Sequence, residues 1–157
     1  MPDIIRDGEI VNAVTERLAQ GESGSADQAY LHASDVVTIE DLSSVYGIWI
    51  ETGDDWNVDA FSIDGISRIA IHFPVFADGR GFSIARMLRD RLKFTGDLMA
   101  CGGIVRDQLH YLRQCGFNSF ALEDGSDLEV AKQSLDTFSK QYQQTVRSPD
   151  PVFRQNA

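Results

Sequence analysis

Two arginines in the sequence are accompanied by glycines in a way that could form an anion-binding site. The first group is Asp78-Gly79-Arg80-Gly81, and the second is Gly102-Gly103 followed by Arg106 and Asp107. A guanidinium offers parallel donors that match a carboxylate or an oxyanion of sulfur or phosphorus, and glycine lets the backbone approach a ligand closely. We expect these residues to bind a small anion. The alternative is that each arginine pairs only with the aspartate beside it.

Catalytic residues are harder to assign. Cys101 ends a predicted strand and could act as a nucleophile if the next helix lowered its pKa, although a small buried thiol is its more ordinary role. His72 lies in an apolar segment, where a hydrogen-bonded core histidine is more common than a catalytic base. An independent enzyme that uses Cys101 or His72 together with Asp78 stays open as an alternative, and no catalytic residue is assigned.

No sequence pattern predicts a metal or a cofactor. Cys101 and Cys115 are the only cysteines, and they form neither a CxxC pair nor a Cys/His cluster. The pair Gly102-Gly103 departs from the GxGxxG fingerprint, and GxxxxGK[ST] is absent. We therefore expect two free thiols, no metal site and no bound cofactor.

Alternating strands and helices must position these residues. Short β-prone or apolar runs predict strands at 43–51, 68–73, 97–101 and 118–122. Apolar stripes predict three helices, with the stripes Ile84-Met87-Leu88-Leu92, Val105-Leu109-Leu112 and Leu128-Ala131-Leu135-Phe138-Tyr142. Asp7-Gly8 predicts an N-terminal β-hairpin, which could lie apart from the main sheet. Residues 22–27 are predicted as a loop, and 56–63 as a short helix.

Strands that alternate with helices at intervals of about 25 residues predict βαβ units and a parallel sheet, so the fold class is α/β. The sheet could be open or could curl into a partial (β/α) barrel. Ligands of such sheets collect beyond the carboxyl ends of the strands, and we expect Arg80 and Arg106 to share one pocket there, with the four glycines as its floor. Residues 1–157 are treated as a single domain, with a hairpin and loop region (1–40), an α/β core (43–146) and a frayed tail (147–157).

The composition limits the partners of the protein. Its 157 residues carry a net charge of −10, which repels phosphate backbones and anionic lipids, so we expect neither nucleic acid nor membrane as a partner. No apolar run approaches the roughly 20 residues of a membrane span, and the N-terminus has no apolar signal region. We expect a cytoplasmic protein and leave homo-oligomerisation open.

Two longer segments carry a family resemblance. The stretches "FADGRGFSIARMLRD" (76–90) and "IVRDQLHYLRQCGFNSFAL" (104–122) resemble, in order and spacing, the signature of the bacterial domain-of-unknown-function family nine-hundred-thirty-four. The resemblance covers roughly residues 45–142, and the opening residues 4–8 are also similar. It adds Ser83, Arg86 and Gln108 to the positions of interest.

Members of that family are often described as oxidoreductases of sulfite reduction. The resemblance implies an accessory protein of sulfite reduction or sulfate assimilation that binds a small anion or a partner, such as a sulfite reductase subunit or another sulfur-assimilation protein. A ligand-free interaction module is a further alternative. Val75, Ala77, Met99 and Gly103 stand where the family usually has Lys, Thr, Arg and Asp, which implies a changed ligand or a lost activity.

Overall fold

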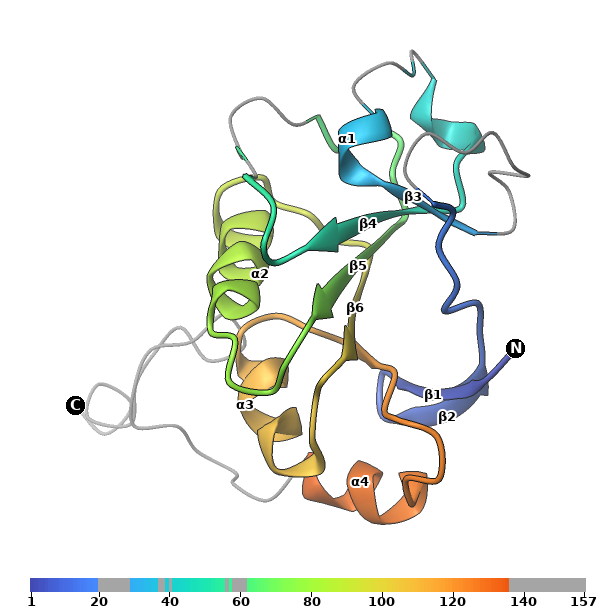
Figure 1. Ribbon diagram of the computed structural model, residues 1–157, viewed down its shortest axis with the longest axis vertical. Coiled ribbons are helices and arrows are strands. Elements are labelled where there is room, and N and C mark those ends of the chain that lie inside the picture. Colours follow the sequence, from blue (N-terminus) through green and yellow to red (C-terminus); the bar gives the residue numbers. More distant parts are fainter. Residues whose placement is uncertain (20–28, 37–38, 40, 56, 58–61, 136–157) are drawn as a thin grey trace, which may run out of the picture.

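The computed structural model describes residues 1–19, 29–36, 39, 41–55, 57 and 62–135. In this part of the chain, seven strands form one sheet in the order β2-β1-β7-β6-β5-β4-β3 (Figure 1). The strands are β1 (Asp3–Arg6), β2 (Glu9–Asn12), β3 (Tyr30–His32), β4 (Gly47–Glu51), β5 (Arg68–Phe73), β6 (Asp97–Gly102) and β7 (Ser119–Phe120). The order starts at β2 and ends at β3, so the sheet is open.

The strands β3 to β7 form the parallel part of the sheet, as the alternation of strands and helices predicts. The longest pairing joins β5 to β6, from Arg68 opposite Asp97 to Phe73 opposite Gly102. Successive side chains of a strand point to opposite faces. Ile69 and Ile71 therefore face one side of the sheet and His72 faces the other, and this alternation decides which residues can meet.

The N-terminal hairpin is part of this sheet. Asp7 and Gly8 have φ values of 51° and 82°, as a type I′ turn requires, so the predicted hairpin is confirmed. Its expected separation from the main sheet is wrong, because β1 also pairs antiparallel with β7. Ile4 and Ile5 point to opposite faces and both are fully buried. A strand that is apolar on both faces needs cover on both, which an isolated hairpin cannot give.

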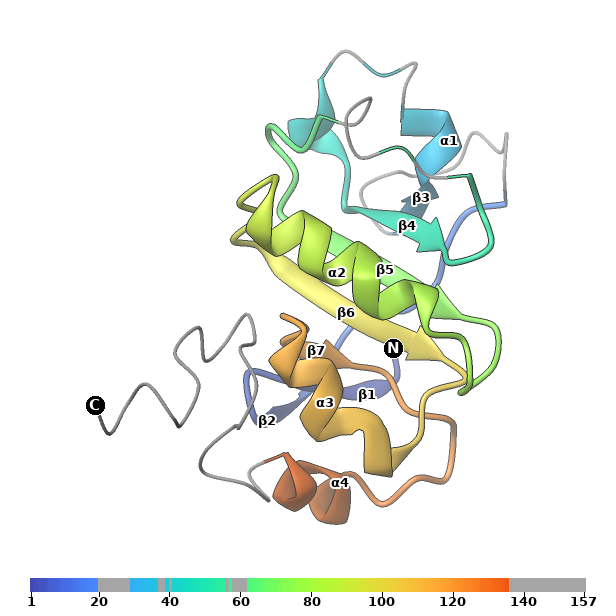
Figure 2. The same ribbon diagram turned by 90° about the vertical axis from the view of Figure 1, so that its left-hand side faces the viewer.

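All four α-helices of the described chain contribute to the core on one face of the sheet. They are α1 (Ala33–Val36), α2 (Arg80–Asp90), α3 (Leu109–Gln114) and α4 (Leu128–Ser134). Figure 2 shows α2 lying over β5 and β6. The helix packs there through Ile84, Ala85 and Leu88, which are at most 6% exposed. Ile84 and Leu88 belong to the predicted stripe, whose other members, Met87 and Leu92, are partly buried against the same core.

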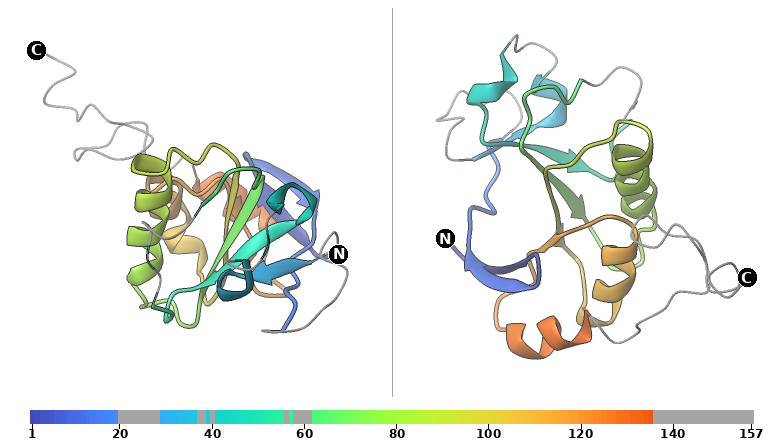
Figure 3. Two further views of the ribbon diagram at one scale, coloured as in Figure 1. Left: turned by 90° about the horizontal axis from the view of Figure 1, so that it is seen from above. Right: turned by 180° about the vertical axis from the view of Figure 1, so that it is seen from behind.

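The opposite face of the sheet has a smaller core. It is formed by Ile4, Ala13, Tyr30, Trp49, Ala70, Met99 and Cys101. Figure 3 shows the chain after β2 running from the hairpin to the far end of the sheet. There Arg17 pairs with Tyr30 at the outer edge of β3. This face has no helix cover in the described chain, which leaves room for polar side chains at its margin.

Several local expectations can be compared with the structure. Val105 is 43% exposed and so does not belong to the buried stripe of α3; the short 3-10 helix η3 (Arg106–Gln108) comes first and turns it outward. Asp127 caps the N-terminus of α4, since its side chain accepts a hydrogen bond from the Val130 amide. The expected loop at 22–27, most of the helix expected at 56–63 and the chain after 135 lie outside the described residues.

Among the described helices, none is both long and apolar enough to cross a bilayer.

Candidate functional site

The Asp78-Gly79-Arg80-Gly81 segment connects β5 to α2 at the carboxyl edge of the parallel strands. Asp78 is buried and accepts two hydrogen bonds from the Arg80 guanidinium, at 2.9 Å from Nε and 2.7 Å from Nη2. The hydroxyl of Thr52, just after β4, donates to Asp78 Oδ2 at 2.6 Å. These hydrogen bonds hold the pKa of Asp78 far below its usual range, and those from Arg80 have the largest effect. Asp78 thus stays ionised at neutral pH and orients Arg80.

Three of the four glycines of the candidate site, Gly81, Gly102 and Gly103, have packing roles. A Cβ at Gly81 would lie 2.3 Å from the Phe73 ring, so its absence lets α2 approach β5 closely. Gly102 has φ +84°, and a Cβ there would meet the Phe73 carbonyl oxygen and the His72 ring. Only Gly79 has no atom within 4 Å of a built Cβ. Close packing therefore explains Gly81, Gly102 and Gly103 without a ligand, and it does not explain Gly79.

Arg106 and Asp107 open η3, one strand further along the same edge. Arg106 Nε lies 3.6 Å from Asp107 Oδ1, and both side chains are largely exposed. They line a hollow of about 360 Å³ whose other walls come from the start of α4 and the chain before it. That hollow is formed by Ile104, Val105, Arg106, Asp107, Leu122, Glu123, Ser126, Asp127, Val130 and Ala131.

The structure corrects the prediction that Arg80 and Arg106 share one pocket. Each arginine pairs with its own loop aspartate, and the hollow beside Arg106 does not include Arg80. The physical reason lies at Gly103, where a Cβ would be 2.9 Å from the Val75 Cα. The loop backbone thus occupies the expected floor of the pocket. Ser83 lies exposed in the first turn of α2, and the binding of a ligand by any of these residues stays a prediction.

A second polar cluster at the same edge was not predicted as a site. Glu51 and His72 are the register partners at the ends of β4 and β5, and Glu51 Oε2 lies 2.7 Å from His72 Nδ1. Both side chains are partly exposed, at 23% and 31%. The signal was present in the sequence, because a strand period of two places Trp49 and Glu51 on the face of Ala70 and His72. Recognising the pair needed the register, which the sequence does not show.

Three neighbours hold Glu51 and His72 in place. Trp49 Nε1 donates to Glu51 Oε1 at 2.8 Å, and its ring stacks on the His72 ring with centroids 5.4 Å apart. Arg17 Nε lies 3.5 Å from Glu51 Oε1. Burial pushes the pKa of Glu51 upward, but the hydrogen bonds from Trp49 and His72 and the charge of Arg17 outweigh it, so this pKa lies below its ordinary value.

The structure also bears on the enzyme alternative. Cys101 is 4% exposed and its Sγ contacts the Ile71 carbonyl oxygen at 3.6 Å, and burial raises the pKa of its thiol well above the ordinary value. A thiol with a raised pKa is a poor nucleophile at neutral pH. The partner of His72 is Glu51 and not Asp78. No group of three or more His, Cys, Asp or Glu side chains within the described ranges is placed to hold a metal ion.

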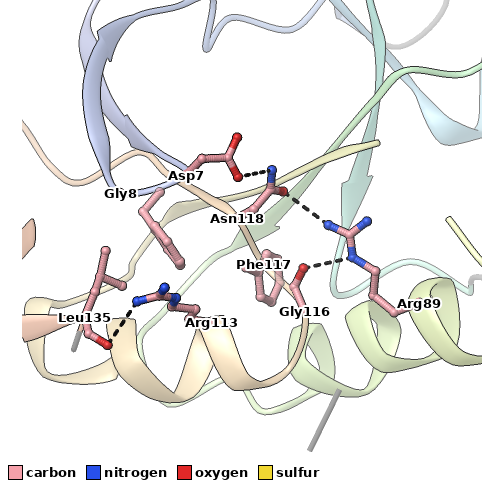
Figure 4. Close-up of a pocket in the computed structure, with 9 residues that line it drawn as sticks. Asp7, Gly8, Arg89, Arg113, Gly116, Phe117, Asn118 and Leu135 are labelled. Carbon is pink, nitrogen blue, oxygen red and sulfur yellow. Dashed lines mark hydrogen bonds between the residues drawn. The ribbon is translucent and has the colours of Figure 1, made fainter. Parts of the chain in front are cut away.

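The opposite end of the strands holds a cavity of about 330 Å³ that none of the predicted site residues lines (Figure 4). Arg89 of α2 lies beside it and donates to three carbonyl oxygens, those of Phe94, Gly96 and Gly116, as well as to the Asn118 side chain. Through these hydrogen bonds, Arg89 connects α2 to the loops that precede β6 and β7. We assign it a structural role.

The positions that depart from the family pattern are divided between surface and core. Val75 is 56% exposed in the loop after β5, and Ala77 lies in the same loop. Met99 is fully buried in the smaller core, and Gly103 is packed against Val75. At Met99, where the resemblance implies an arginine, the side chain lies inside the molecule, and an apolar side chain needs no partner there.

The protein is thus an α/β protein with an open, mostly parallel sheet. Polar clusters lie at the carboxyl ends of its strands. The chain belongs to the family described as bacterial protein of unknown function (DUF934), whose family model matches residues 47–153. Searches of the curated proteins and of the solved structures found no match to the chain.

Proposed function

We propose that this protein binds a small oxyanion at the carboxyl ends of β4 and β5, as a cytoplasmic accessory protein of bacterial sulfite reduction. The observation that carries the proposal is that the Arg80 guanidinium is held in one orientation and is still exposed. Both oxygens of Asp78 hold its guanidinium, yet the side chain is 60% exposed. An arginine that is both oriented and exposed can bind an oxyanion while losing little further conformational freedom.

Arg80 keeps donors for a ligand after it has paired with Asp78. The Asp78 oxygens accept from Nε and Nη2, and Nη1 has no acceptor among the described residues. Both terminal nitrogens lie 3.8 Å from the point where a Gly53 Cβ would be. The lack of a side chain at Gly53 leaves the space beside the guanidinium open. The choice of a sulfur oxyanion follows from the family resemblance.

A thermal-shift series with sulfite, sulfate, phosphate and adenosine phosphosulfate tests the proposal. A ligand at a hundred times its Kd stabilises the folded state by about 2.7 kcal/mol, which raises the melting midpoint of a chain of this size by several degrees. We expect that rise for the wild type and for Arg91→Ala, an exposed arginine at the opposite end of the same helix. Arg80→Ala should show none. If no anion raises the midpoint, or if Arg80→Ala responds like the wild type, the proposal is wrong.

A second candidate function, docking of a partner reductase, is favoured by a separate observation. Large apolar side chains lie exposed around the same edge; they are Val75, Phe76, Val105, Tyr111 and Val130. Val105 and Val130 line one hollow, and Gln108 links Val105 to Phe76 through hydrogen bonds to the Val105 amide and the Phe76 carbonyl. Several exposed apolar side chains in one region of a surface are typical of protein interfaces.

This second candidate is tested by mixing the purified protein with a purified sulfite reductase subunit at moderate salt and measuring complex formation. Phe76→Ser should weaken the complex, since it removes the most exposed aromatic ring of the patch. Asp64→Ser, an exposed change away from the patch, serves as the control. Equal binding by both variants, or none by the wild type, rules out docking of this reductase at this patch.

A further inference from the structure

The hollow beside Arg106 has an apolar lining. Ile104 and Ala131 are at most 3% exposed, and Leu122 is partly buried against the core. Val105 and Val130 line the same hollow and are 43% and 39% exposed. The helices η3 and α4, between which the hollow lies, pack against each other. A hollow of about 360 Å³ with such a lining can take an apolar side chain of another molecule.

The hollow is also negatively charged. Its lining includes three exposed carboxylates, those of Asp107, Glu123 and Asp127. Of the described residues that line the hollow, Arg106 is the only basic one, and it lies 3.6 Å from Asp107. Three carboxylates and one guanidinium give the lining a net charge of −2. Lys132 of α4 does not reduce this charge, because it pairs with Glu9 of β2 at 3.1 Å.

The apolar surface extends beyond the hollow. Gln108 accepts from the Val105 amide at 3.2 Å and donates to the Phe76 carbonyl oxygen at 2.6 Å, which holds the loop after β5 next to η3. Val75 and Phe76 of that loop are 56% and 63% exposed. A small molecule would fill the hollow and leave these side chains exposed, whereas a segment of protein can cover both.

We propose that the hollow binds a short segment of a partner protein in which an apolar side chain is flanked by lysine or arginine. The apolar side chain contacts Val105 and Val130, and the basic side chains lie against Glu123 and Asp127. This inference rests on the docking surface proposed above as the second candidate function, and it is independent of anion binding at Arg80. A second copy of the chain is a poor occupant, because a symmetric contact would bring two negative hollows together and each chain has a net charge of −10.

Two short peptides with blocked ends test the inference on the isotope-labelled wild-type protein by nuclear magnetic resonance. The basic peptide has Leu-Phe between two Lys-Arg pairs, and the acidic peptide has Leu-Phe between two Glu-Asp pairs. We expect the basic peptide to shift the amide resonances of Val105, Glu123 and Val130 in a saturable way, and to bind roughly tenfold more tightly than the acidic one. Added salt should weaken this binding. Equal binding of the two peptides, binding of neither, or shifts confined to another surface overturns the inference.

Variants separate the hollow from the general charge of the protein. Glu123→Lys should weaken binding of the basic peptide, whereas Asp64→Lys, the same change of net charge at an exposed position away from the hollow, should bind almost like the wild type. Val105→Ser removes an exposed apolar side chain and should also weaken binding, by roughly tenfold. Equal losses in Glu123→Lys and Asp64→Lys would show a general attraction of charges and overturn the inference.

The measurement with the sulfite reductase subunit distinguishes this inference from the function on which it rests. If the reductase binds and Phe76→Ser weakens its complex, but the basic peptide does not bind at the hollow, docking stands and the inference is wrong. If the basic peptide binds at the hollow and the reductase does not bind, the inference stands and the reductase is not the partner.

Discussion

Thr52 and Asp78, 26 residues apart in the chain, are joined by a buried hydrogen bond of 2.6 Å. Thr52 follows β4 and Asp78 follows β5, so the bond ties together two loops at the carboxyl edge of the sheet. The same carboxylate receives the Arg80 guanidinium. Asp78 is therefore the residue that fixes the candidate anion site.

Acid should remove the stabilisation that Asp78 provides. Arg80 and then Thr52 lower the pKa of Asp78 in the folded state below its unfolded value of about 3.9. A lowered folded-state pKa gives stability that is fully present above the unfolded pKa and is lost as the pH falls toward the folded one. Melting midpoints measured from about pH 6 down to pH 3 should drop less for Asp78→Asn than for the wild type. Parallel curves would show that Asp78 is not the group responsible.

Gly102 should tolerate a side chain far less well than Gly79. Gly102→Ala places a Cβ 2.4 Å from the Phe73 carbonyl oxygen at a φ of +84°, so we expect a loss of about 2 kcal/mol or more in the free energy of unfolding. Gly79→Ala enters open space at a φ of −78° and should be neutral or slightly stabilising. Urea unfolding of the two variants makes the comparison. Equal effects would contradict the close approach at Gly102.

The hydroxyl of Tyr30 should contribute nothing to stability. Tyr30 is fully buried, and its hydroxyl has no hydrogen-bond partner in the described part of the chain. Burial, and then the charge of Asp97, raise the pKa of this phenol. Since an unsatisfied buried hydroxyl costs about 1–3 kcal/mol, Tyr30→Phe should leave the free energy of unfolding unchanged or increase it. Tyr30→Ala is the contrast, since it removes the ring and should destabilise strongly. A clear loss in Tyr30→Phe would reveal a partner for the hydroxyl.

Neither cysteine should react quickly in the folded protein. Cys101 and Cys115 are free and buried, and burial raises the pKa of both thiols. We expect slow labelling by iodoacetamide near neutral pH, with both sites becoming reactive in denaturant. Mass spectrometry of the labelled peptides distinguishes the two. Rapid labelling of Cys101 in the native state would restore the thiol as a candidate nucleophile.

Local patterns were enough to predict the elements that carry the fold. The Asp7-Gly8 turn, the apolar run of β5 and the stripe of α2 each depend on neighbours a few residues away, so the sequence alone indicates them. The place of the hairpin depends instead on β1 pairing with β7, more than a hundred residues later. The exposure of Val105 depends on a 3-10 turn that the stripe cannot show.

For the candidate site too, the sequence predicted some features and the tertiary structure decided the others. Asp78 and Arg80 are two residues apart, and the sequence by itself predicted both their place at the carboxyl edge and the alternative that they pair with each other. The Glu51–His72 pair, the link through Thr52 and the separation of Arg80 from Arg106 were decided by the tertiary structure. Register across β4 and β5 puts Glu51 opposite His72, and the close packing of Val75 on Gly103 keeps the two arginines apart. Register and packing arise from contacts between distant segments, which no local pattern of residues encodes.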